Sequence, residues 1–151
     1  MKGLIKTTIF LMAVLFLAAC SRKKNTFLSR SKHSVTAEFN ILYHGNLAFE
    51  NGKQELARSY KDNFWEILPV ERLELEESNV LPGESKEGSF NLAEEKAAKA
   101  IQKHSIYLEG KEYNPQIDES YILLGKARYY DGRFVQALDA FNFILKTYPT
   151  C

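Results

Sequence analysis

Residues 118–149 read DESYILLGKARYYDGRFVQALDAFNFILKTYP, and this stretch decides the fold class. Two runs with helical spacing flank Asp131-Gly132, a dipeptide that favours a turn, and Pro149 ends the second run. The pattern predicts an antiparallel helical hairpin over 118–151 in an all-α protein. The residues expected on the inner faces of the two helices are Tyr121, Leu124, Gly125 and Ala127 in the first, and Phe134, Ala137, Leu138, Phe141 and Leu145 in the second.

This predicted hairpin resembles a tetratricopeptide repeat (TPR), a helical unit of 34 residues with Leu-Gly in the first helix, a glycine at the turn and a closing proline. Gly125 and Ala137 would let the two helices approach closely, because larger side chains there would overpack the contact. Two residues depart from the pattern. Arg128 replaces the usual aromatic residue of the first helix, and Ile144 replaces a small residue of the second.

A second copy of the pattern occurs eighty residues earlier. Gly45, Gly52, Ala57 and Pro69 match Gly125, Gly132, Ala137 and Pro149 in residue type at that spacing. We therefore expect a degenerate TPR-like hairpin over 35–69, with its turn at Gly52. Its aromatic residues, Trp65 among them, belong either to the core or to a groove that binds a partner. The apolar candidates are Ile41, Leu47, Phe49, Leu56, Tyr60, Phe64 and Leu68.

The region between the two hairpins divides into a loop and a single helix. Glutamates, Pro82 and two glycines over 70–90 predict an inserted acidic loop. Residues 91–117 predict a helix and a linker, which together make half a repeat. Asn91 is the expected N-cap, with Glu94 in a capping box, and the helix is expected to continue to Leu108. Stacked hairpins of this kind form an α-solenoid.

The N-terminus has the outline of an export signal over 1–19. Lys2 and Lys6 precede an uncharged run that is too short to span a bilayer. The run ends in Leu17, Ala18, Ala19 and Cys20, which resembles the bacterial lipobox, whose cysteine receives the lipid. Cys20 is thus the expected lipid attachment site, and buried acyl chains would make anchoring stable. The alternative is an ordinary secretory signal followed by a chance cysteine.

Residues 20–34 predict a flexible, lipidated tether. It carries five basic residues and no acidic one, whereas the whole chain has 20 basic and 19 acidic residues, so the rest of the mature chain is acidic. A solvated tether near anionic lipid is the expected role, because the overall charge of +1 does not suit a dedicated nucleic-acid binder. We expect no nucleic-acid partner.

Motifs of enzymatic chemistry are missing from the sequence. It has no phosphate-binding glycine loop, no HExxH, no GxSxG and no paired CxxC. His33, His44 and His104 are dispersed, and the two cysteines, Cys20 and Cys151, make neither a disulfide framework nor a zinc site. We expect no enzyme, catalytic residue, cofactor, metal or small-molecule substrate. The enzyme alternative is a periplasmic cell-wall hydrolase that uses glutamates of the inserted loop, such as Glu71 or Glu74.

The mature sequence resembles one family more specifically, the SprE/PorW type of TPR lipoprotein in gliding motility and type IX secretion of Bacteroidota. The segments that carry the resemblance are CSRKKNTFLSR, TAEFN, DNFWEILPVERL, AEEKAAKAIQKHSIY, GKEYNPQIDE, LLGKARYYDGRF and ALDAFNFIL. The resemblance implies an outer-membrane scaffold facing the periplasm, without an enzymatic centre. Its implied partners are the type IX translocon and periplasmic ring or motor proteins.

The resemblance also bears on length and on a competing assignment. Members of this type look longer, with further repeats after the equivalent of Pro149, so we expect the 151 residues to be the N-terminal part of a truncated array, with Cys151 a product of that ending. The main alternative is an outer-membrane TPR lipoprotein that serves another envelope assembly system, such as β-barrel assembly.

Overall fold

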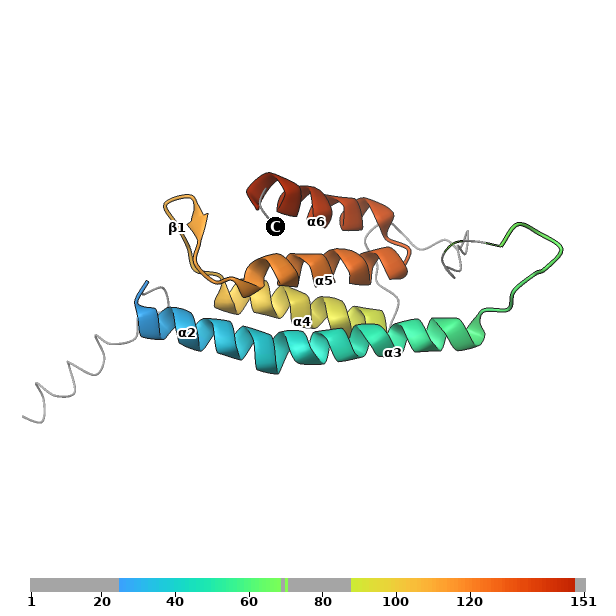
Figure 1. Cartoon of the computed structure of the whole chain (residues 1–151), viewed down its shortest axis with the longest axis horizontal. Coiled ribbons are helices and arrows are strands. Elements are labelled where there is room, and N and C mark those ends of the chain that lie inside the picture. The colour runs from blue at the N-terminus through green and yellow to red at the C-terminus, as the bar shows by residue number, and fades with distance from the viewer. Residues whose placement is uncertain (1–24, 69, 71–87, 149–151) are drawn as a thin grey trace, which may run out of the picture.

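The computed structural model describes residues 25–68, 70 and 88–148, and these residues are mostly helical (Figure 1), in agreement with the all-α prediction. A β-hairpin with strands of two residues each is the one sheet in this part of the chain. The elements in chain order are α2 (Phe27–Thr36), the π-helix η1 (Ala37–Leu42), α3 (Tyr43–Ser59), α4 (Ser89–His104), β1 (Tyr107–Leu108), β2 (Lys111–Glu112), α5 (Gln116–Tyr130) and α6 (Phe134–Thr147).

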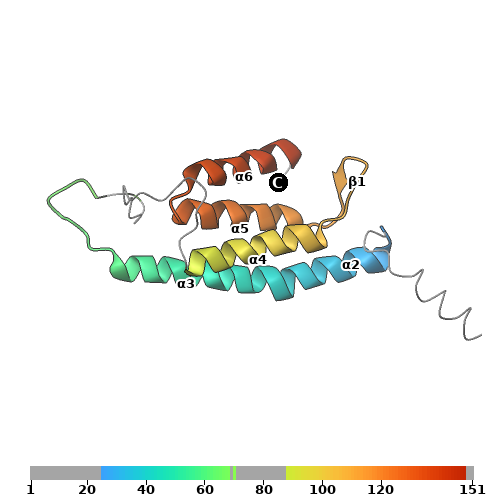
Figure 2. The ribbon, with the colours of Figure 1, turned by 180° about the vertical axis from the view of Figure 1, so that it is seen from behind.

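The helices lie side by side in a stack, in the order α3, α4, α5, α6, and each runs antiparallel to the one before it (Figures 1 and 2). α2, η1 and α3 follow one another without a break and form one long rod along one side of the stack. α5 also contacts η1 and α3 directly. α4 and α5 are therefore the inner helices, and the rod and α6 are the outer ones.

Small residues allow the inner helices to pack closely. Ala93, Ala97 and Ala100 recur at helical spacing along α4, and all three are fully buried. On the rod, a Cβ atom at Gly45 would lie 2.7 Å from Leu123 Cδ2 of α5, which is closer than side chains pack. Gly45 therefore lies at a close contact between the rod and α5.

The hairpin predicted after residue 118 is present as α5 and α6. Gly132 has φ of +80° in the turn, a conformation that favours glycine. A Cβ at Gly125 would lie 2.5 Å from Phe141, and Ala137 is buried. The predicted inner face of the second helix is partly wrong. Phe134, Leu138 and Leu145 are exposed, while the buried positions besides Ala137 are Ala140 and Ile144.

The hairpin predicted over 35–69 is wrong. α3 runs straight through Gly52, which is buried inside the helix, and ends only at Ser59. The reason is a packing contact: a Cβ at Gly52 would lie 2.7 Å from the Phe90 ring of α4, so this glycine serves helix packing and not a turn. Ala57, predicted to pack, is exposed.

Other predicted features of that hairpin also change. Tyr60 has ψ of 129°, and residues 60–68 are not helical, so Phe64 and Trp65 lie exposed outside any helix and not in the core. Of the apolar candidates, Ile41 and Phe49 are buried, whereas Leu47 is exposed.

The predicted tether over 20–34 is wrong from Phe27 onward, where the chain is helical, and its residues 20–24 lie outside the described residues. Thr26 caps this helix, since its Oγ1 accepts a hydrogen bond from the backbone N–H of Ser29 at 3.3 Å. A side chain that satisfies a free N–H at the first turn stabilises a helix start, and the sequence prediction did not weigh Thr26. α2 then continues into η1, whose Ala37 and Leu42 are buried.

The boundaries of α4 differ from the predicted ones at both ends. It begins at Ser89, so Asn91 is not its N-cap, and the carboxylate of Glu94 binds arginines of other segments. It ends at His104, whose carbonyl accepts a hydrogen bond from Nδ2 of Asn114 at 2.9 Å. The chain then enters the β1–β2 hairpin, where Glu109 and Gly110 both have positive φ.

Several predicted features lie outside the described residues. These are the export signal over 1–19, the lipid attachment site Cys20, most of the acidic loop over 70–90, and the residues Pro69, Pro149 and Cys151. In the part of the chain that is described, no helix combines the length and the apolar character needed to cross a bilayer.

Candidate functional site

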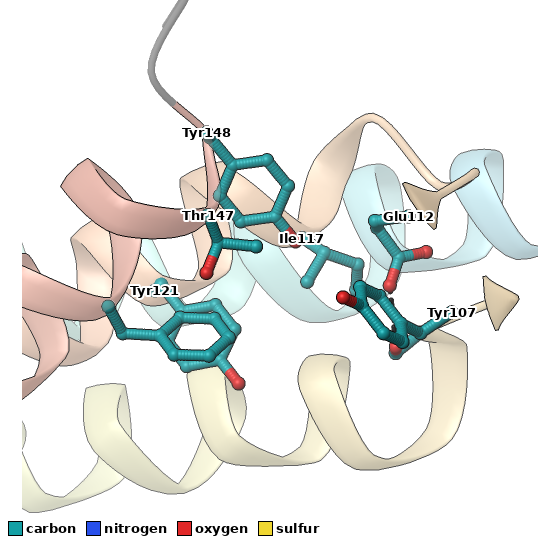
Figure 3. Close-up of a pocket in the computed structure, with 8 residues that line it drawn as sticks. Tyr107, Glu112, Ile117, Tyr121, Thr147 and Tyr148 are labelled. Carbon is teal, nitrogen blue, oxygen red and sulfur yellow. Dashed lines mark hydrogen bonds between the residues drawn. The ribbon is translucent and has the colours of Figure 1, made fainter. Parts of the chain in front are cut away.

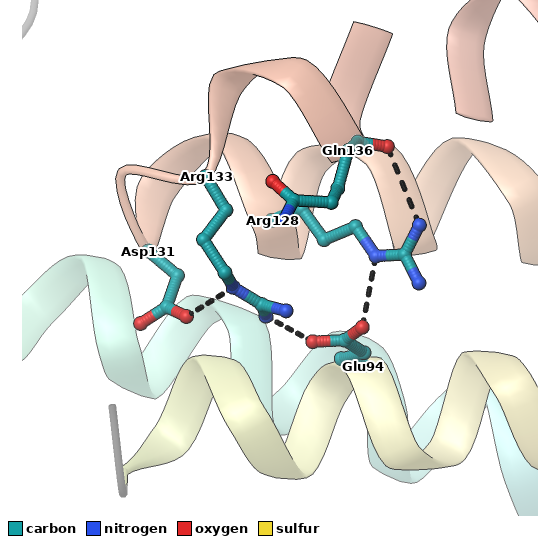
Figure 4. A network of polar contacts seen from close by, with 5 residues as sticks. All are labelled: Glu94, Arg128, Asp131, Arg133 and Gln136. Carbon is teal, nitrogen blue, oxygen red and sulfur yellow. Dashed lines mark hydrogen bonds and ion pairs between the residues drawn. The ribbon is translucent and has the colours of Figure 1, made fainter. Parts of the chain in front are cut away.

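Four charged residues form a network between α4 and the α5–α6 turn (Figure 4). Glu94 of α4 accepts a hydrogen bond through Oε1 from Nε of Arg128 at 2.8 Å, and its Oε2 pairs with Nη2 of Arg133. Nε of Arg133 in turn donates to Oδ2 of Asp131 at 2.7 Å. One carboxylate thus joins the last turn of α5 and the residue before α6 to α4.

This network keeps Glu94 ionised. Burial raises the pKa of Glu94, but the hydrogen bonds and positive charges of Arg133 and Arg128 outweigh burial, so the pKa lies below its ordinary value. Arg128 also donates from Nη1 to the carbonyl of Gln136 at 3.3 Å. The residue that departs from the TPR pattern, Arg128, therefore connects three helices by polar contacts where the usual aromatic residue would pack.

A pocket of about 340 Å³ opens at the other end of the α5–α6 pair (Figure 3). It lies where the end of α4, the β-hairpin, the start of α5 and the end of α6 meet. Ile117 is fully buried at its base. The residues that line the pocket are Ser105, Tyr107, Glu112, Ile117, Tyr121, Phe143, Thr147 and Tyr148.

The Glu112 side chain fastens the segment around this pocket. Its Oε1 accepts hydrogen bonds from the backbone N–H groups of Ile106, Tyr113 and Asn114, at 2.7, 3.0 and 2.9 Å. Its Oε2 accepts one from Oγ of Ser105 at 2.6 Å. These donors are neutral, and no ion pair to Glu112 occurs among the described residues, so its negative charge faces the pocket without a cationic partner.

Burial and the charge of Glu112 together raise the pKa values of two tyrosines that line the pocket. The rings of Tyr121 and Phe143 lie 4.4 Å apart between centroids. Burial raises the pKa of the Tyr121 hydroxyl, and the charge of Glu112 raises it further. Burial likewise raises the pKa of Tyr148, and Glu112 is the largest of the charges that add to it. Both tyrosines are therefore neutral around pH 7, and the pocket carries net negative charge.

The structure brings together two histidines that the sequence analysis took as dispersed. Nδ1 of His33 in α2 lies 3.1 Å from Nδ1 of His104, at the end of α4. Burial, with the charges of His33 and Lys103, lowers the pKa of His104, so the neutral ring is favoured. No cluster of three or more metal-binding side chains occurs within the described ranges.

The predicted packing residues do not gather at the pocket, apart from Tyr121. Gly45, Gly125 and Ala137 lie at helix contacts, and Gly132 lies in the turn next to the charge network. Of the pocket residues in the β-hairpin, Tyr107 was missed because residues up to Leu108 were expected to be helical, and Glu112 was missed because it lies in the stretch expected to be a linker. Gly110 was the available signal, since glycine adopts the positive φ that a tight two-residue hairpin turn requires.

No protein-family model matches the chain, and a search of the curated proteins finds no significant relative.

Proposed function

We propose that this protein is a lipid-anchored scaffold at the outer membrane, facing the periplasm, that binds other proteins through TPR-like helical hairpins. In this proposal it acts in type IX secretion and gliding motility, as a protein of the SprE/PorW type. Its partners are the translocon and periplasmic ring or motor components, and its mechanism is positioning, because anchoring raises the effective concentration at which partners meet.

The observation that carries the proposal is the antiparallel helical stack packed through glycine and alanine. In TPR arrays the first helix of one repeat packs on both helices of its neighbour. Here α5 contacts α3 and α4 as well as α6. This supports a pairing of α3 with α4 and of α5 with α6 as successive hairpins, with 60–88 as the connection inside the first pair. The proposed array therefore has two complete pairs in place of two and a half units.

An exposed apolar face supports a binding role for the outer helix. Val135, Leu138 and Leu145 of α6 are each more than half exposed. Solenoids use such faces either to stack a further repeat or to bind a partner. The lipobox resemblance of Leu17 to Cys20 supports the location.

The lipid anchor is tested by metabolic labelling. Radiolabelled fatty acid is expected to enter the wild-type protein and not the Cys20→Ala variant, because the thioether needs the cysteine sulfur. Cys151→Ala is the matched control and is expected to be labelled like the wild type. Equal labelling of wild type and Cys20→Ala would contradict the anchor.

The secretion role is tested by deletion. Loss of the gene product is expected to abolish export of type IX cargo while the levels of outer-membrane β-barrels stay unchanged. Depleted barrels with normal cargo export would favour the adaptor of another assembly system. Normal cargo, barrels and gliding together would contradict the proposal.

A further inference from the structure

The pocket at the end of the α5–α6 pair has the composition of a site for a cation. Tyr107, Tyr121, Phe143 and Tyr148 supply aromatic rings, and Glu112 supplies a full negative charge (Figure 3). Aromatic faces attract cations electrostatically, and the attraction grows when the cation leaves water. A neutral apolar ligand would gain nothing from the carboxylate.

The Glu112 side chain is held in a fixed position, which favours the binding of a cation. Four neutral donors already hold its carboxylate, so the charge cannot swing away to meet solvent. The charge of Glu112 is thus positioned before any ligand arrives, which reduces the ordering that binding requires.

The protein's own cations leave the pocket free in the described structure. Arg30 and Lys111 lie over the ring of Tyr113, with Cζ and Nζ at 5.3 and 5.8 Å from the centroid, and Tyr113 is not a lining residue. The pocket volume of about 340 Å³ lies near the lower end of the range for small-molecule sites, about 300–1,000 Å³. It suits one long side chain better than a folded element.

We propose that this pocket binds the arginine or lysine side chain of a partner protein segment. The cationic head lies between the rings of Tyr107, Tyr121 and Tyr148 and faces the Glu112 carboxylate. This inference rests on the proposed adaptor function in one respect, namely that the occupant belongs to another protein. It adds the chemistry by which that partner is recognised.

The test uses a short glycine peptide with one central arginine, titrated into the purified, isotope-labelled full chain and followed by NMR. Saturable shifts are expected at the amides of Tyr107, Tyr121 and Tyr148, with a Kd on the order of 1 mM, as fits a single side chain. The matched peptide carries citrulline, which has the shape of arginine without its charge. It is expected to bind about tenfold more weakly. Equal binding of the two peptides, or no shift at these amides, would overturn the proposal.

Variants then locate the site. Glu112→Gln could unfold the segment around the pocket, because that carboxylate binds the surrounding backbone. The test therefore uses substitutions of the aromatic lining residues. Tyr107→Leu and Tyr148→Leu are each expected to weaken arginine-peptide binding about fivefold, with the rest of the spectrum unchanged. Tyr43→Leu, at an exposed tyrosine on α3, is the control and is expected to bind like the wild type. Unchanged affinity in both wall variants, or an equal loss in Tyr43→Leu, would remove the site.

Failure here is distinguishable from failure of the proposed function. The peptide assay contains no lipid, membrane or secretion component. A negative titration would therefore remove the pocket assignment and leave the labelling and deletion results standing. An unlabelled Cys20 would remove the anchor and leave peptide binding intact.

Discussion

The α5–α6 hairpin and the rod from Phe27 to Ser59 carry similar small-residue patterns at a spacing of eighty, yet one turns and the other does not. Gly45 and Gly125 behave alike, since both lie where two helices touch. Gly52 and Gly132 behave differently. Gly132 has positive φ in a turn, whereas Gly52 lies inside α3 under the Phe90 ring.

The difference shows that a glycine alone does not specify a turn. At Gly132 the neighbouring residues help to fix the turn, because Asp131 and Arg133 form an ion pair with each other and Arg133 forms one with Glu94 of α4. Beside Gly52, Lys53 pairs with Glu50 at 3.5 Å and lies over the Phe49 ring, with Nζ 5.7 Å from the centroid. Both contacts span one helical turn and favour the helix. The same residue type therefore serves a turn in one place and close packing in the other.

The largest expected effect is a difference in stability between substitutions at Ala137 and Ala57, the two alanines that lie eighty residues apart. Ala137 is buried at the α5–α6 contact, so Ala137→Glu places an unpaired charge in the core and should cost about 4 kcal/mol of unfolding free energy. Ala57 is exposed on α3, so Ala57→Glu should change stability by less than about 0.5 kcal/mol. Urea unfolding followed by circular dichroism measures both. Similar losses in the two variants would mean that the regions pack alike.

A proline tests the continuity of the rod directly. Lys53→Pro removes a backbone donor inside α3 and should cost about 3 kcal/mol, whereas a proline just after a turn would be tolerated. Lys61→Pro is the control, because it follows Tyr60, whose ψ of 129° suits a residue before proline. Its thermal midpoint should stay near the wild-type value. A harmless Lys53→Pro would restore the hairpin at Gly52.

Much of the fold is predictable from the sequence where local and long-range signals agree. Around Asp131-Gly132, the turn residues, the helical spacing and the small residues all favour one hairpin, and that hairpin forms. The helix after the acidic loop is also predicted, and its buried residues Ala93, Ala97 and Ala100 repeat at helical spacing. A prediction from sequence is reliable where the local preferences of the residues agree with the packing of the whole fold.

The rest depends on contacts between distant residues, which periodicity does not report. The fate of Gly52 depends on Phe90, and the role of Arg128 depends on Glu94, each pair lying more than thirty residues apart along the chain. The pocket likewise depends on Glu112, whose hydrogen bonds to the surrounding backbone exist only once the chain folds back there. In the sequence, Glu112 lies in the linker predicted after a helix that ends at Leu108, and nothing in that pattern indicates these hydrogen bonds.

The charge network predicts a pH-dependent difference between the two regions. Glu94→Gln should cost about 2 kcal/mol at pH 7, because two arginines lose a charged partner at a part-buried site. The pKa of Glu94 is lowered in the folded protein, so its contribution is complete above the ordinary value of 4.5 and is lost as the pH falls through the folded pKa. The cost of the substitution should therefore shrink on acidification below that value.

Glu50→Gln on α3 is the matched control for this network. Its partner Lys53 is exposed, so the cost should stay below about 0.5 kcal/mol at every pH. Unfolding curves in urea between pH 3 and 7 measure the two differences. A cost at Glu94 that stays constant across this range would show that the carboxylate stabilises the fold through packing and not through its charge.

The smallest expected effect concerns the two unlike glycines and is a coupling between substitutions. Gly132→Ala should cost about 1 kcal/mol, because its φ of +80° disfavours a side chain, and nothing lies within 4 Å of the added Cβ. At Gly52, alanine favours the helix, but its Cβ meets the Phe90 ring at 2.7 Å. The cost there should depend on residue 90, whereas the cost at Gly132 should not.

Phe90→Leu separates these two mechanisms, because it removes the ring that crowds Gly52. In double-mutant cycles measured by urea unfolding, Gly52→Ala and Phe90→Leu should couple by about 0.5–1 kcal/mol, with the double variant more stable than the sum of the single effects predicts. Gly132→Ala and Phe90→Leu should be additive within about 0.3 kcal/mol. Additivity at Gly52 would mean that Phe90 does not decide its conformation, and the straight course of the rod would then need another cause.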